Sequence, residues 1–155
     1  MVAYSFKAQF IGPIRTGLGI EHLNERGKIV IPGPRPKRQT IRAIGKRRHA
    51  LEGDELQLYY GMRTRQCKLI GRARCLSTQG VYLKWSEWPS FATFDMIELD
   101  PGVWRRSGDL REIHNMEKFA AEDGFDSLAD MRAFWEKEHG GQTFEGVLIK
   151  WVAIP

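Results

Sequence analysis

The sequence lacks the features that would place the protein in several large classes. Only two of its 155 residues are cysteines, Cys67 and Cys75, and their spacing fits neither a zinc knuckle nor the disulfide framework of a small secreted domain. No apolar run is long enough to cross a bilayer, and the first residues lack the hydrophobic core of a signal peptide. We therefore expect a cytoplasmic protein with reduced thiols and no membrane partner.

Common catalytic and cofactor-binding motifs are missing as well. No glycine-rich loop leads into Lys-Ser or Lys-Thr, and no serine lies in the pattern of a nucleophile elbow. The four histidines (His22, His49, His114 and His139) are scattered, so we do not expect a metal site built from them. The sequence predicts no cofactor and no metal.

Acidic residues are absent from one long stretch, where basic residues concentrate instead. No Asp or Glu occurs between Arg26 and Leu51. The cations of this stretch are Arg26, Lys28, Arg35, Lys37, Arg38, Arg42, Lys46, Arg47 and Arg48. Together with a net charge of +5, this concentration favours an anionic partner, and nucleic acid before a membrane surface.

Part of this basic stretch has the pattern of a strand. The segment 39–42 alternates polar and apolar residues and includes the β-branched pair Thr40 and Ile41, as in a short half-buried strand. Successive side chains of a strand point to opposite faces. If Ile41 faces the core, Thr40 and Arg42 share the other face, so the positive charge is held by an ordered element.

The rest of the chain predicts a single α+β domain over residues 1–155. Its 42% hydrophobic residues and five tryptophans are enough for one core. Proline and glycine at 18–36 predict a long loop insertion. Apolar spacing and capping-box patterns that start at Asp109 and Ser127 predict two helices, which end near Gly124 and Gly140. The expected strands lie at 4–10 (passing into a helical turn), 39–42, 56–60, 67–76, 81–85, 96–99 and 143–152, with Gly71 marking a bulge.

Lys37 and Thr40 form a candidate catalytic pair. A lysine in a dry site near other cations can lose its proton near neutral pH and serve as base for a hydroxyl or a water. A carboxylate is needed to orient such a lysine or to carry protons. Glu122 and Asp123, at the end of the first predicted helix, are the candidate donors, and the residues alone leave the choice between them open.

Five groups of residues together resemble the ASCH domain family, over residues 2–76 and 117–152. They are Lys37-x-x-Thr40-x-Arg42, the basic linker after it, Gly53-Asp54-x-Leu56-x-Leu58, Gly61-Met62-Arg63-Thr64 and Asp123-Gly124-Phe125. The resemblance implies a PUA-like β-barrel with two flanking helices.

The resemblance also implies an activity. Small bacterial ASCH proteins hydrolyse N4-acetylcytidine with a lysine, a threonine three residues later and a glutamate in the later helix. Lys37 and Thr40 match the first two positions. The third falls on Asp123, with Glu122 beside it, so the chain departs from the pattern either in residue type or by one position.

The expected function is therefore binding of RNA or of a modified cytidine nucleoside in a basic cleft, with hydrolysis of the N4-acyl amide. Two alternatives remain open, namely cleavage of single-stranded RNA in the same cleft and RNA binding without catalysis. The side chains expected to hold phosphate or to polarise the leaving group are Arg38, Arg42, Lys46, Arg47, Arg48, Arg63 and Arg65.

Overall fold

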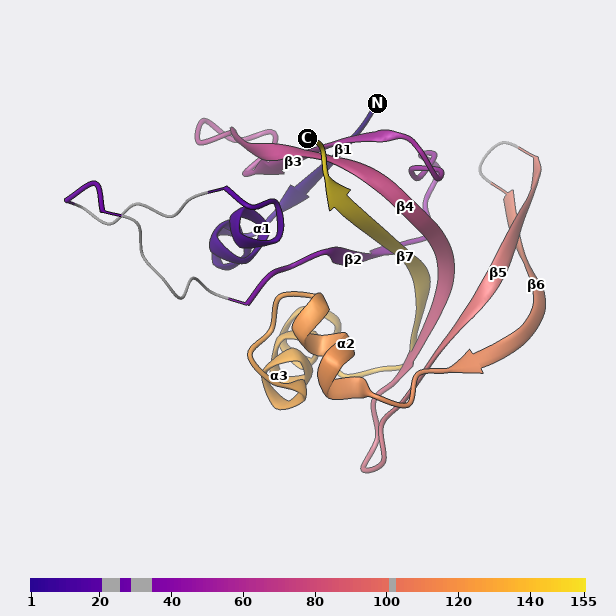
Figure 1. Ribbon diagram of the computed structural model, residues 1–155. Coiled ribbons are helices and arrows are strands. Elements are labelled where there is room, and N and C mark those ends of the chain that lie inside the picture. The colour runs from indigo at the N-terminus through magenta and orange to yellow at the C-terminus, as the bar shows by residue number, and fades with distance from the viewer. Residues whose placement is uncertain (21–25, 29–34, 101–102) are drawn as a thin grey trace.

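The computed structural model describes residues 1–20, 26–28, 35–100 and 103–155, which contain seven strands and three α-helices (Figure 1). The helical elements are the 3-10 helix η1 (Ala8–Phe10) and the helices α1 (Ile11–Gly17), α2 (Met116–Glu122) and α3 (Leu128–His139). The strands are β1 (Val2–Phe6), β2 (Gln39–Ala43), β3 (Glu55–Tyr60), β4 (Lys68–Lys84), β5 (Ser90–Asp100), β6 (Val103–Glu112) and β7 (Phe144–Ala153).

All described strands belong to one sheet, which β4 organises. Along its length β4 pairs antiparallel with β3, β5 and β7, while β1 adds in parallel to β3 and β6 adds antiparallel to β5. The β2 strand pairs with β7 alone, with Thr40 opposite Ile149. The β5–β6 hairpin extends to the right edge of Figure 1, whereas the three helices lie toward the left, beside β2.

This arrangement confirms the predicted α+β class. In the described part of the chain the sheet is open, since β1 and β2 each pair on one edge only, so a closed barrel is not shown. Residues from the strands and from all three helices share the buried core; the largest fully buried apolar side chains are Trp151, Phe91, Phe94, Ile14, Leu56, Leu58, Leu83, Met131, Leu148 and Ile149.

The predicted strands at 67–76 and 81–85 are one continuous strand. The polar segment that was expected to separate them pairs with β7, with Ser77 opposite Lys150 and Gly80 opposite Val147. Gly80 is required because a Cβ there would lie 2.0 Å from the ring of Phe94. The predicted bulge near Gly71 is confirmed, since the register with β3 shifts beside it.

The first predicted helix begins later than expected. Residues 109–112 form the end of β6, so the apparent capping box at Asp109 is wrong, and α2 instead begins after Asn115, whose side chain caps the Lys118 amide at 2.9 Å. Pairing with β5 holds this segment extended, with Arg111 bound to Asp95 at 2.7 Å. The Ser127 cap of α3 is confirmed.

The predicted loop insertion at 18–36 lies largely outside the described residues. Where the chain is described, no helix has both the length and the hydrophobicity to cross a membrane.

Candidate functional site

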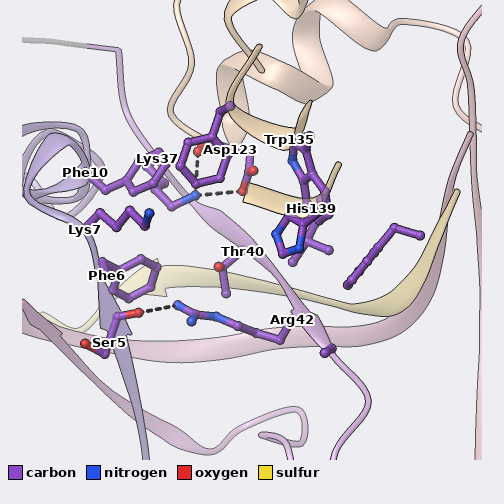
Figure 2. Close-up of a pocket in the computed structure, with 14 residues that line it drawn as sticks. Ser5, Phe6, Lys7, Phe10, Lys37, Thr40, Arg42, Asp123, Trp135 and His139 are labelled. Carbon is purple, nitrogen blue, oxygen red and sulfur yellow. Dashed lines mark hydrogen bonds and ion pairs between the residues drawn. The ribbon is translucent and has the colours of Figure 1, made fainter. Parts of the chain in front are cut away.

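A cavity of about 390 Å³ lies where β1 and β2 approach each other without pairing. Its lining comes from β1, β2, the η1 helix, the end of α2, the last turns of α3 and the start of β7 (Figure 2). Lys37, Thr40, Arg42 and Asp123 all line it, so four of the residues singled out in the sequence meet in one hollow. Its volume falls in the usual range of small-molecule sites.

Main-chain hydrogen bonds fix the segment that carries the lysine. The Lys37 amide donates to the Pro13 carbonyl of α1 at 2.9 Å, and the Arg38 amide donates to the Glu122 carbonyl of α2 at 2.8 Å. The Arg38 carbonyl in turn accepts from the Trp151 amide of β7 at 3.0 Å. Two helices and the sheet therefore hold this short segment before β2 begins.

The Lys37 side chain is buried to 2% exposure and ends against Asp123. Its Nζ donates to Asp123 Oδ1 at 2.7 Å and also to the Asp123 carbonyl (Figure 2). That carbonyl is one of the free acceptors at the end of α2, where a positive charge is favourable. The ammonium also lies 4.6 Å from the centroid of the Phe10 ring.

Two glycines make room for the lysine. Gly124 has φ +91° and packs on the Lys37 stem, where an added Cβ would lie 3.0 Å from the lysine Cβ. A Cβ on Gly17 would lie 2.2 Å from the Lys37 carbonyl oxygen. The sequence Asp123-Gly124 therefore both ends α2 and allows the close approach of Lys37.

Burial shifts the pKa values of both Lys37 and Asp123. It lowers the pKa of Lys37, because a desolvated ammonium is costly, and the adjacent Asp123 carboxylate only partly opposes this. Burial likewise raises the pKa of Asp123 against the opposing effect of Lys37. The two shifts bring the proton affinities of the amine and the carboxylate closer together than they are in water, as a base and its proton carrier require. Burial is the main cause of the lowered pKa of Lys37, and the nearby cation Arg42 adds to it only as the smallest of the causes.

Thr40 and Arg42 lie on the same face of β2, as predicted, and both face the cavity (Figure 2). Thr40 is buried, and its hydroxyl forms no hydrogen bond with any described residue, so both its donor and its acceptor remain free for a ligand. Arg42 donates from Nη2 to the Ser5 carbonyl of β1 at 2.8 Å. Its guanidinium carbon lies 4.7 Å from the centroid of the Phe6 ring. Arg42 thus links the two unpaired strand edges.

Aromatic rings form much of the remaining wall. The ring of Trp135 lies 4.4 Å from that of His139 and 4.7 Å from that of Phe144, measured between centroids. Phe10 packs edge-on against Phe134 at 5.6 Å. These rings give the cavity flat apolar surfaces that suit a planar aromatic ligand.

Glu122 points away from this cavity. Its carboxylate lies 3.8 Å from Lys150 Nζ and is partly exposed, while Asp123 is the carboxylate that meets Lys37. Two adjacent acids at one helix end therefore have different surroundings. Of the two donors left open by the sequence, the structure brings only Asp123 to the lysine.

The other predicted phosphate-binding cations lie outside the cavity lining. Arg38 lines a separate hollow next to α2, and Arg48 is bound to Asp54 at 2.7 Å. The remaining side chains are exposed, on the linker after β2 and on the loop after β3; they are Lys46, Arg47, Arg63 and Arg65. The structure therefore separates the catalytic candidates from most of the basic surface.

Sequence reasoning missed the aromatic and histidine wall. Phe6, Phe10 and Trp135 have the apolar spacing of core residues, and His139 has no partner motif, so nothing local marks them as cavity residues. Their meeting depends on long-range packing. Among the described residues, no three His, Cys, Asp or Glu side chains come together as a metal site would require.

Comparison with models of known protein families, with curated proteins and with solved structures found no match for this chain.

Proposed function

We propose that the protein is an ASCH-like hydrolase that binds an N4-acylated cytidine nucleoside in the Lys37 cavity and removes the acyl group. The observation that carries the proposal is the buried Lys37–Asp123 pair, with a free threonine hydroxyl in the same cavity. The finer fold assignment, a PUA-like barrel, is part of this proposal and rests on the motif resemblance.

The cavity chemistry supports an amide substrate with a flat ring. The aromatic wall would stack on a pyrimidine, and a cavity of about 390 Å³ suits a nucleoside better than a folded polymer. Arg42, a permanent cation in the wall, would polarise the acyl carbonyl and stabilise the oxyanion that forms on attack.

The proposed reaction consumes one water. Lys37, as the free amine beside the Asp123 carboxylate, takes a proton from the attacking hydroxyl of Thr40 or of a water that Thr40 positions, and Asp123 orients the amine and shares the proton that it receives. The oxygen attacks the acyl carbon, and the bond between that carbon and N4 breaks. Lys37 then returns its proton to N4, which leaves as the amino group of cytidine. If Thr40 is the nucleophile, water hydrolyses the resulting ester and regenerates its hydroxyl.

Incubation with N4-acetylcytidine tests the proposal, with cytidine and acetate separated by chromatography. We expect both products in equal amounts, and we expect the Lys37→Met variant to form them about 10²–10⁴ times more slowly. A single-stranded RNA is incubated in parallel. Cleavage of that RNA without deacylation would show that the protein is a ribonuclease and not a deacylase. Binding of RNA without either reaction would show an RNA-binding module without catalysis.

A further inference from the structure

A second concave surface runs along α2, on the side away from the catalytic cavity. It consists of two hollows of about 290 and 280 Å³, which share Lys118, Glu122 and Lys150. Arg38 and Gln39 line it, whereas Lys37 and Thr40 line the cavity. We call the two joined hollows the α2 groove.

Positive charge dominates the α2 groove. Arg35, Arg38, Lys118 and Lys150 line it, and Glu122 is the one carboxylate among its described lining residues. Glu122 approaches Lys150 only to 3.8 Å, with both side chains about 40% exposed (38% and 41%), so this pair is weak and leaves the groove strongly cationic.

The groove cations do not hold the fold together. Arg38 makes its structural hydrogen bonds through its main chain, to Glu122 and Trp151, and its side chain is exposed. Lys118 is likewise an exposed side chain on α2. Their guanidinium and ammonium groups are therefore available to a ligand.

The apolar part of the groove gives a further indication of the ligand. Leu76 is 52% exposed there, beside Pro36 and Trp151. Cations beside an exposed apolar side chain suit a strand that offers phosphates together with bases or sugars.

We propose that the α2 groove binds single-stranded nucleic acid. All four cations line the first hollow, and Lys118 and Lys150 also border the second, so the concave surface continues beyond the place where one phosphate would bind, which suits a linear polyanion. Hollows of about 290 and 280 Å³ can admit single bases or sugars, whereas a duplex is too wide to enter them. This site is separate from the hydrolase cavity, and the proposal stands whether or not the deacylation occurs.

Fluorescence anisotropy with a labelled oligouridylate, measured over a range of salt concentrations, tests the groove. We expect binding that weakens as salt rises. For a single strand each lost phosphate contact reduces the slope of log affinity against log salt by about 0.7. The pair Lys118→Gln and Lys150→Gln should therefore reduce it by about 1.4, and adding Arg35→Gln and Arg38→Gln by about 2.8 in total.

The matched control is the pair Lys46→Gln and Arg47→Gln, which removes the same charge from exposed residues outside the groove. Thermal unfolding checks that each variant is folded. A larger loss of slope in the groove pair than in the control pair supports the proposal. Equal losses, a larger loss in the control pair, or no binding by the unchanged protein at low salt would overturn it. Tighter binding of a duplex, or equal binding of an acidic peptide, would overturn the assignment to a single strand.

Discussion

The two sides of the segment 37–40 use positive charge in opposite ways. On the cavity side a single lysine is buried against one carboxylate, among aromatic rings. On the side of the α2 groove, four cations stand around a single carboxylate and reach solvent. A lysine is thus suited to proton transfer where it is buried, and to attraction of phosphate where it is exposed to solvent.

The adjacent acids Glu122 and Asp123 show the same contrast between an exposed and a buried charged group. Asp123 caps α2 and points to Lys37 with 5% exposure, while the Glu122 side chain points to Lys150 and water. Position at the helix end, and not acidity, decides which carboxylate can exchange a proton with the buried amine. The predictions below test this contrast.

The largest effect is expected from Lys37→Met, which removes the proposed base and keeps a similar length. Deacylation should fall by a factor of about 10²–10⁴, the usual worth of general base catalysis. Removing one partner of a buried ion pair also costs about 3–5 kcal/mol of unfolding free energy. Rates from product analysis and thermal unfolding measure the two effects.

The double variant Lys37→Met with Asp123→Leu separates the effect on the rate from the effect on stability. Replacing both charges by apolar groups removes the unpaired carboxylate, so stability should recover relative to the single variant while the deacylation rate stays as low as in Lys37→Met. Recovery of activity together with stability would assign Lys37 a structural role only.

The next largest effect compares the two adjacent acids. Asp123→Asn should slow deacylation by about 10², because the amide keeps the shape but cannot carry the proton. Glu122→Gln should change the rate by less than about twofold, because its carboxylate lies outside the cavity. The reverse order of effects would make Glu122 the proton carrier.

The deacylation rate should fall more when Thr40 loses its hydroxyl than when it loses its methyl group. Thr40→Val keeps the shape and should lower the rate by at least about tenfold, whereas Thr40→Ser should retain most activity. Because the hydroxyl forms no hydrogen bond among the described residues, the valine variant should unfold at nearly the wild-type temperature. Equal activity of both variants would remove the hydroxyl from the reaction.

The smallest effect is a shift of the pH profile. Activity should rise with pH as Lys37 loses its proton, and burial places this rise below the pKa of a free lysine. The Asp123 charge raises the pKa of Lys37, so in Asp123→Asn the residual kcat/KM should rise at lower pH than in the wild type. A shift to higher pH, or none, would contradict the coupling of the two groups.

Local patterns in the sequence predicted the β2 face correctly, because alternation of side chains is a local property. The residues alone named Glu122 and Asp123 as candidate partners of Lys37, and the family resemblance placed Asp123 at the third catalytic position. The choice between them needed the structure, since 86 residues separate Lys37 from Asp123. The prediction that a helix begins at Asp109 was wrong, because this segment pairs with β5. That pairing, together with the ion pair between Arg111 and Asp95, outweighs the helix-capping pattern. The prediction of two strands separated near Gly80 was also wrong, because this glycine makes room for the Phe94 ring and does not form a turn.

The aromatic wall could not be predicted for a similar reason. Phe6, Trp135 and Phe144 come from three distant elements, and each has the spacing of an ordinary core residue. Only the packing of α3 on the sheet brings them to one cavity. The cationic stretch was visible in the sequence, but its division between the two sides of β2 required the register of that strand.

The most direct test of the proposed mechanism is an NMR titration of the lysine side chains, following the ¹³Cε and ¹⁵Nζ signals. We expect one lysine with a pKa below the ordinary lysine value; its signal should be absent from Lys37→Met, and its pKa should be lower still in Asp123→Asn. If every lysine titrates together near the ordinary value, Lys37 is not a base held by burial, and the proposed mechanism is wrong.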